Sequence, residues 1–186
     1  MSCSASSLKI GRAVAVALCG SAEIKDPEIE RVSFELGCAV AEQGWTLVCG
    51  GKTGVMEAAC RGVRCAVSRK GSRGLAVGIL PGGDFREANP YCDVVIPTGI
   101  GLARNSVVVR SGDVVVVVNG ASGTLSEAAY AWQFGLPIVL MEETGGWAEK
   151  LAGMLRIDDR DRPPLMRAGS AEEAVNLIKD VLGIVG

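Results

Sequence analysis

Short apolar runs alternate with longer stretches of helical periodicity from one end of the chain to the other. This alternation predicts parallel β-strands joined by right-handed helical crossovers, and hence an α/β fold built on one sheet. The third, fifth and sixth runs are apolar almost throughout, which is typical of strands covered by helices on both faces, so we expect those three in the middle of the sheet. The predicted strands are Ala13–Leu18, Trp45–Cys49, Leu75–Leu80, Asp93–Ile96, Asp113–Val118 and Pro137–Met141.

Polar residues between these runs indicate where helices begin and end. Asp26 followed by Pro27 predicts the start of a helix, and Gly44 is well placed to end it. Ser170–Glu173 has the form of a capping box, which predicts an amphipathic helix near the C-terminus. The stretch Asp158–Pro164 is rich in charge and proline and is therefore expected to be an exposed loop.

Length and composition limit the chain to one domain. It has 186 residues, of which 48% are hydrophobic and 22% charged, enough to bury a single core. We expect a Rossmann-like, doubly wound, mostly parallel sheet of about six or seven strands with helices on both faces, spanning 1–186 with a disordered tail at 1–8. The longest apolar run, Val114–Val118, is far shorter than the ~20 residues of a membrane-spanning helix. Met1–Ser7 lacks the features of a secretory signal, so we expect a cytoplasmic protein without a membrane partner.

The chemistry open to this chain is restricted by its composition. Histidine is absent, which excludes a Ser-His triad, an imidazole base and a His-ligated zinc ion, and no metal site is predicted. The net charge of -2 and the scattered basic residues argue against binding a nucleic-acid backbone. The seven cysteines are an odd number without a C-x-x-C pair, which favours reduced core thiols over a disulfide framework. A small molecule is therefore the expected partner.

Glycine-rich turns follow five of the predicted strands. Parallel strands end at one edge of the sheet, so these turns are expected to lie together where open α/β folds bind ligands. Their backbone N–H groups and the positive ends of helix dipoles suit a phosphate, although glycine also occurs in such turns merely because the turn is tight. The expected phosphate- or nucleotide-binding residues are Gly20, Ser21, Gly50, Gly51, Gly54, Gly101, Gly120, Ala121, Ser122, Gly123 and Thr124.

Two charged residues near these turns could take part in chemistry. Glu127 lies about one turn into a predicted helix, within reach of a sugar attached to the phosphate, or it complements the helix dipole. Arg104 is expected near the start of the preceding helix, where it could bind phosphate or stabilise a leaving group, or pair with a surface carboxylate. The run Gly51-Lys52-Thr53 is not a Walker A loop, because Thr46 stands where that motif requires glycine.

With these motifs the chain resembles the Lonely Guy (LOG) superfamily, often labelled "possible lysine decarboxylase", and within it most closely the molybdenum-cofactor carrier proteins. The resemblance extends from about residue 13 to 141. It rests on Cys19-Gly20-Ser21, Gly50-Gly51-Lys52-Thr53-Gly54-Val55-Met56, Gly-Leu-Ala-Arg-Asn at 101–105 and Gly-x-x-Gly-Thr-x-x-Glu at 120–127. The family's P-G-G-x-G-T motif here begins with asparagine and has Ala121 in place of its second glycine.

The resemblance implies two alternative functions. In the LOG enzymes the glutamate matched by Glu127 works with an upstream arginine, matched in spacing by Arg104, to hydrolyse the N-glycosidic bond of a nucleoside 5′-monophosphate without a cofactor. In the carrier branch the same fold holds molybdopterin as cargo, and a nucleotide sensor is a third interpretation. A lysine decarboxylase is not expected, because such chemistry usually needs a pyridoxal cofactor.

We also expect a homodimer or larger homo-oligomer. Members of the resembled family associate through their helices, and two stretches of this chain have apolar residues that could serve such contacts. These stretches are Ser106–Val109 and Ala128–Trp132.

Overall fold

The computed structural model describes residues 13–154 and 156–184, so the predicted tail at 1–8 and Cys3 lie outside the described residues. One sheet of seven strands has the order β4-β3-β2-β1-β5-β6-β7, and every pairing is parallel. The strands are β1 Ala15–Gly20, β2 Thr46–Cys49, β3 Leu75–Leu80, β4 Val94–Pro97, β5 Val114–Val118, β6 Ile138–Met141 and β7 Leu165–Ala168. The helices are α1 Pro27–Glu42, α2 Val55–Lys70, α3 Arg104–Arg110, α4 Ser122–Phe134, α5 Gly146–Ala152 and α6 Ala171–Leu182, with short 3-10 turns at Phe85–Glu87 and Gly101–Ala103.

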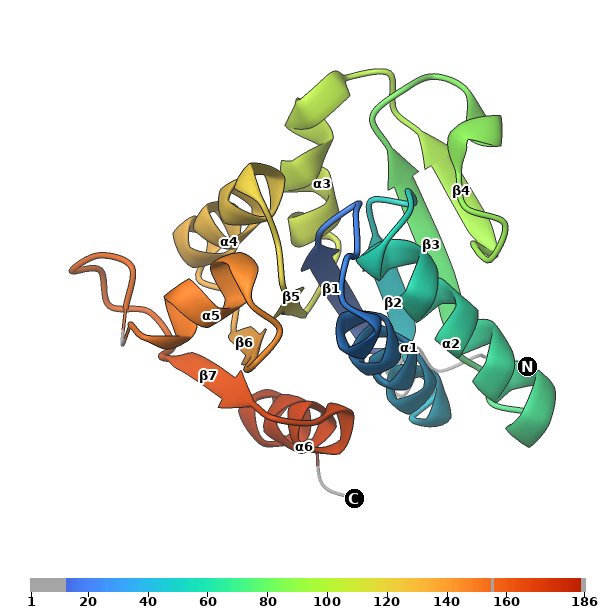
Figure 1. Cartoon of the computed structure of the whole chain (residues 1–186). Coiled ribbons are helices and arrows are strands. Elements are labelled where there is room, and N and C mark those ends of the chain that lie inside the picture. The colour runs from blue at the N-terminus through green and yellow to red at the C-terminus, as the bar shows by residue number, and fades with distance from the viewer. Residues whose placement is uncertain (1–12, 155, 185–186) are drawn as a thin grey trace, which may run out of the picture.

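This architecture confirms the predicted α/β, doubly wound Rossmann-like sheet. The helices form two layers, with α1, α2 and α6 on one face of the sheet and α3, α4 and α5 on the other (Figure 1). The chain begins at the centre of the sheet with β1, builds outward to β4, then returns to pair β5 with the other side of β1. The carboxyl ends of β1 and β5 therefore flank the switch point, the usual ligand site of such sheets.

Two details of the predicted sheet were wrong. The prediction put β3, β5 and β6 in the middle; β5 does lie beside the central strand β1, but β3 and β6 lie one strand in from the edges. The helices cover the sheet well beyond its centre, so an apolar strand need not be central. The prediction also missed β7, a short edge strand of sequence LMRA with one exposed arginine.

The helix boundaries follow from the capping residues, as predicted. The Asp26 carboxylate accepts a hydrogen bond from the Glu28 amide at the start of α1, and α1 ends just before Gly44, which adopts a positive φ of 73°. The Ser170 hydroxyl accepts from the Glu173 amide at the start of α6. Capping of this kind satisfies amides that have no partner within the helix.

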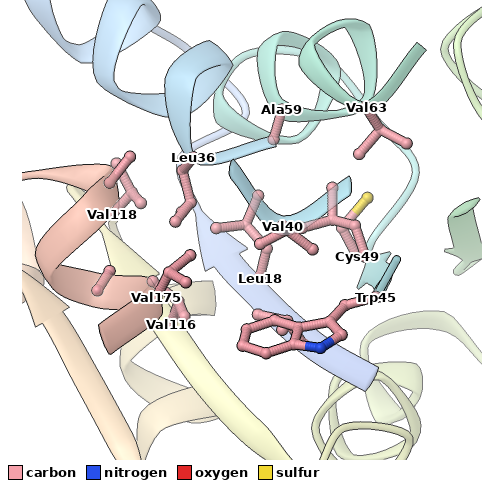
Figure 2. Packing of buried hydrophobic residues seen from close by; sticks show 14 of the residues in the cluster. Leu18, Leu36, Val40, Trp45, Cys49, Ala59, Val63, Val116, Val118 and Val175 are labelled. Carbon is pink, nitrogen blue, oxygen red and sulfur yellow. The ribbon is translucent and has the colours of Figure 1, made fainter. Parts of the chain in front are cut away.

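The two largest hydrophobic cores lie on opposite faces of the sheet. The side chains of β5 alternate between them: Val116 and Val118 pack with α1, α2 and α6, whereas Val115 and Val117 pack with α3, α4 and α5. Figure 2 shows the first core, where Leu36 lies close to the central strands. The predicted loop Asp158–Pro164 is largely exposed, which confirms that expectation.

The stretches expected to supply apolar surface for an oligomer are mostly buried within the single chain. Val109, Ala128, Ala131 and Trp132 are at most 2% exposed, because they form the core between the sheet, α3 and α4, and Val108 is equally buried against β1, β2 and β3. The apolar residues that α3 and its preceding turn do expose are Ile100, Leu102 and Val107. These two stretches therefore do not provide the exposed contact surface expected of them, and the oligomer itself stays a prediction.

In the described part of the chain, no helix combines the length and apolar character needed to cross a bilayer.

Candidate functional site

The loops after β1 and β5 meet at the switch point of the sheet. The Ser21 hydroxyl, just beyond β1, donates a hydrogen bond of 2.7 Å to the side-chain oxygen of Asn119, just beyond β5. Asn119 adopts a positive φ of 54° and its amide side chain donates to the carbonyl of Thr144. A strained backbone held by several contacts is typical of a functional turn. These contacts fix the two loops relative to each other.

The N-terminus of α4 forms an open cradle for an anion. Its N-cap residue, Ala121, provides no side-chain hydrogen bond to the helix, and Ala121, Ser122 and Gly123 are exposed. The first helical bond runs from the Leu125 amide to the Ala121 carbonyl, so the amides of Ser122 to Thr124 belong to the first turn, which has no helical acceptor. Those amides and the helix dipole together favour a phosphate.

The turn that leads into α4 is shaped to present those amides. Gly120 has a φ of 110°, and a Cβ there would lie 2.5 Å from the Thr124 side chain, so glycine is required. The carbonyls of Asn119 and Gly120 accept hydrogen bonds from the first amides of α5, at Ala148 and Trp147. Because these carbonyls point toward α5, the N–H groups of the turn face the edge of the sheet where a ligand would bind. The space around Gly123 is open, which lets a ligand oxygen approach the backbone.

Arg104 and Glu127 form a buried ion pair beside this cradle. The Arg104 Nη1 donates to the Glu127 Oε1 at 3.3 Å, and the two residues are only 8% and 6% exposed. The Arg104 Nε is buried without a hydrogen-bond partner. A buried polar group without a partner costs free energy, so it marks a position where a ligand oxygen would be stabilised. The alternative role of Arg104, as a surface arginine paired with an exposed carboxylate, does not apply, because Arg104 is buried and pairs with buried Glu127.

Burial controls the charge of Glu127. Desolvation raises the pKa of its carboxyl from the ordinary 4.5 to about 7, although the Arg104 guanidinium and a hydrogen bond from the Cys19 thiol both lower it. Glu127 therefore changes protonation near neutral pH, as expected of a group that exchanges protons during catalysis. The alternative role of Glu127 as a helix-dipole complement fits poorly, because it lies in the second turn of α4 and contacts charged Arg104.

Glycines elsewhere in the site leave room for neighbouring groups. A Cβ at Gly50 would lie 2.5 Å and 2.6 Å from the two terminal nitrogens of Arg104, so the guanidinium packs directly on this backbone. A Cβ at Gly54 would lie 2.4 Å from the Ser21 carbonyl oxygen, and one at Gly20 would meet the Val55 side chain at 2.4 Å. These glycines bring the loops after β1 and β2 together.

Two adjoining cavities open along this edge. The smaller, of about 210 Å³, is lined by Arg104, Glu127 and the first turn of α4, together with Met56 and Leu102. The larger, of about 560 Å³, lies on the other side of the loop after β1, against the start of α1. The two share three lining residues, Ser21, Ala22 and Ala121, so one elongated ligand could occupy both.

The structure brings most, but not all, of the predicted site residues together. The smaller cavity is lined by Gly20, Ser21, Ala121, Gly123 and Thr124 together with Arg104 and Glu127, and Gly120 borders the larger one. Gly51 turns inward, where its amide contacts the Cys49 sulfur and its carbonyl accepts from the Asn89 amide. Gly101 lies in an exposed 3-10 turn.

Sequence reasoning missed three polar residues of the site. Cys19 is a buried core thiol, as expected, but it also acts on Glu127, because it lowers the pKa of that carboxyl. Asn105 donates to the Ser126 hydroxyl at 2.9 Å and to the Gly123 carbonyl at 3.5 Å, which holds the start of α4 against α3. Asn119 was noted only as the residue before the glycine turn. Cys19 and Asn105 both lie within the motifs that carry the family resemblance, and that position in the sequence was the signal that could have identified them.

The strand order and the ligand edge at the switch point define the chain as a Rossmann-like α/β domain. Within that class, the chain belongs to the SLOG cluster4 family, whose model matches residues 13–175. The predicted relationship to the LOG superfamily, near its molybdenum-cofactor carrier branch, is thereby confirmed, because relatives of both kinds match this chain.

Three relatives illustrate this position. The cytokinin riboside 5′-monophosphate phosphoribohydrolase of Mycobacterium tuberculosis is 32% identical over 127 residues, which are 63% of this chain and 65% of the enzyme. The solved structure of a molybdenum cofactor binding protein from Rippkaea orientalis is 32% identical with a TM-score of 0.79, and the match covers 92% of this chain and 99% of that one. The molybdenum cofactor carrier protein of Chlamydomonas reinhardtii is 30% identical with a TM-score of 0.76, covering 92% and 99%.

Proposed function

We propose that this protein binds a phosphorylated, nucleotide-like small molecule at the switch point and hydrolyses the N-glycosidic bond of a nucleoside 5′-monophosphate. The observation that carries the proposal is the buried Arg104–Glu127 pair, 3.3 Å apart, directly beside the open N-terminus of α4. An anion cradle and a carboxyl that ionises near neutral pH, within one small cavity, supply the two parts that such a hydrolase needs.

The phosphate is held by the first turn of α4. The amides of Ser122, Gly123 and Thr124 donate to its oxygens, and the helix dipole adds to the attraction. Binding energy from this remote group orients the sugar without taking part in the bond change. The ribose then extends toward Glu127, which lies in the second turn of the same helix.

Glu127 and Arg104 act on the bond between C1′ and the base. Water adds across that bond and yields ribose 5-phosphate and the free base. The ionised Glu127 stabilises the oxocarbenium-like charge on the sugar and orients the sugar hydroxyls or the water. Arg104, whose Nε is without a partner, assists departure of the base by stabilising its developing negative charge.

A second function, a carrier that holds molybdenum cofactor as cargo without transforming it, is favoured by a different observation. The adjoining cavity of about 560 Å³ provides room for a ligand larger than a nucleoside monophosphate. The molybdenum-cofactor proteins also match this chain over nearly their whole length, whereas the phosphoribohydrolase matches over about two thirds. Arg104 and Glu127 would then be ligand contacts only.

Turnover of AMP and other nucleoside 5′-monophosphates separates these functions. Purified protein is incubated with each compound, free base is measured by chromatography, and binding is measured by calorimetry. The hydrolase predicts base release that disappears in Glu127→Gln, while Glu172→Gln, the same change at an exposed site on α6, leaves it intact. Binding without base release across the panel, weakened by Gly123→Pro, would favour the carrier. Absence of any binding would refute the proposed anion cradle.

A further inference from the structure

Three cysteine sulfurs lie together beneath the loop that follows β2. The Cys60 sulfur on α2 is 3.6 Å from that of Cys49 at the end of β2 and 3.9 Å from that of Cys92, which precedes β4. All six cysteines in the described residues are free thiols. No group of histidine, cysteine and carboxylate residues in the described ranges is arranged to hold a metal ion, so these thiols are not explained as ligands.

Cys92 is the accessible member of this group. Cys49 and Cys60 are fully buried, whereas Cys92 is partly exposed, in the segment between the 3-10 turn at Phe85–Glu87 and β4. A Cβ at Gly78 would lie 2.8 Å from the Cys92 sulfur, so glycine in β3 makes room for that sulfur. Hydrogen bonds from the Cys49 and Cys60 thiols lower the pKa of Cys92, and the nearby Arg64 charge adds to this effect. A partly exposed thiol with thiolate character reacts readily with oxidants.

We propose that Cys92 and Cys60 form a redox pair that is oxidised by hydroperoxides. The Cys92 thiolate attacks the peroxide oxygen, giving a sulfenic acid and releasing one hydroxide or alcohol equivalent. The Cys60 thiol then attacks the Cys92 sulfur and displaces water, so two thiols and one hydrogen peroxide yield one disulfide and two waters. Closing the 3.9 Å gap to a disulfide of about 2 Å requires the Cys92 segment to move, since Cys60 is held in a helix.

That movement reaches the candidate site through Asn89. The Asn89 amide donates to the Gly51 carbonyl at 2.8 Å, and its side chain donates to the Lys52 carbonyl at 3.0 Å. The Cys92 amide in turn donates to the Asn89 carbonyl, so the two residues belong to one turn. Shifting this turn releases the loop after β2, whose Gly50 supports the Arg104 guanidinium. Oxidation therefore loosens the position of Arg104.

The test treats the reduced full-length protein with hydrogen peroxide. Peptide mapping by mass spectrometry identifies the disulfide, and hydrogen exchange followed by NMR measures protection of the Asn89 amide. We expect a Cys60–Cys92 linkage and exchange of the Asn89 amide at least about tenfold faster in the oxidised protein. Neither readout depends on a ligand, so failure here is distinguishable from failure of the proposed function.

Three alanine variants control the result. Cys92→Ala and Cys60→Ala are expected to abolish the linkage and the faster exchange. Cys65→Ala, at a partly exposed thiol of α2 outside the group, should retain both, although Cys65 neighbours Cys38. A linkage confined to Cys38 and Cys65, irreversible oxidation of Cys92 alone, or a Cys60–Cys92 bond with unchanged Asn89 exchange would each overturn the proposal. Circular dichroism of each reduced variant verifies the fold.

Discussion

Replacing Glu127 by glutamine changes how the stability of this protein depends on pH. Glutamine keeps the shape of the side chain but carries no titratable proton. In the wild-type protein the carboxyl is buried beside Arg104, and desolvation raises its pKa to about 7 from the ordinary 4.5 that it has in the unfolded chain. The folded state therefore binds the proton more tightly than the unfolded state does.

The sign and size of the effect follow from that difference. Below pH 4.5 Glu127 is protonated in both states, and its full contribution to stability is present. As the pH rises from 4.5 through about 7, the unfolded chain ionises first and the wild-type protein loses stability. A pKa difference of about 2.5, at about 1.4 kcal/mol for each pKa unit, corresponds to about 3 to 4 kcal/mol in full. Because Arg104 is common to both proteins, Glu127→Gln should gain about 3 kcal/mol relative to wild type between pH 4 and pH 8.

Urea unfolding followed by circular dichroism at a series of pH values measures this quantity directly. The informative number is the difference in unfolding free energy between the two proteins at each pH. The contributions of all other titrating groups are common to both proteins and cancel in this difference. A constant difference across the series would refute the argument, because it would mean that Glu127 has the same pKa folded and unfolded. Turnover, where the ionised carboxylate is required, should fall as the pH drops through about 7.

Three further predictions test other parts of the structure. Gly50→Ala forces a methyl group against the Arg104 guanidinium and should reduce turnover or ligand affinity by about 100-fold, whereas Gly83→Ala, where the space is open, should change neither. Ser170→Ala removes the N-cap of α6 and should lower the free energy of unfolding by about 1 kcal/mol in urea titrations. Leu140→Ala opens a cavity in a fully buried position of β6 and should cost about 2 to 5 kcal/mol in the same assay, and a smaller loss would mean that this core collapses around the gap.

Most of the fold could be predicted because local signals agreed with the final structure. Apolar runs gave six of the seven strands to within about two residues, and the caps at Asp26 and Ser170 marked real helix starts. The order of strands was less accessible, since an apolar run shows that both faces are covered and carries no information about which strand lies beside it. β7 was missed because LMRA is short and alternates only weakly.

The site could be predicted from the sequence as a set of glycine-rich turns, but the contacts between its side chains could not be predicted. Motif spacing identified Arg104 and Glu127 individually, but their approach to 3.3 Å depends on how α3 packs against α4. The need for glycine at position 50 also depends on the tertiary structure. It arises because the Arg104 side chain, 54 positions further along the chain, packs against the Gly50 backbone. Cys19 carried no polar signal and acquires its role only by lying next to Glu127.

The last helix has a consequence for how the polypeptide acquires its shape during synthesis. α6 returns to the face occupied by the first helix, where Ile178 and Val175 join the same core as Leu36 (Figure 2 labels Leu36 and Val175). A nascent chain that has produced everything up to β7 still exposes part of that apolar face to solvent. Cooperative folding of this core must therefore wait until α6 has been synthesised, and truncation before α6 would leave an intermediate with exposed apolar surface for chaperones or proteases.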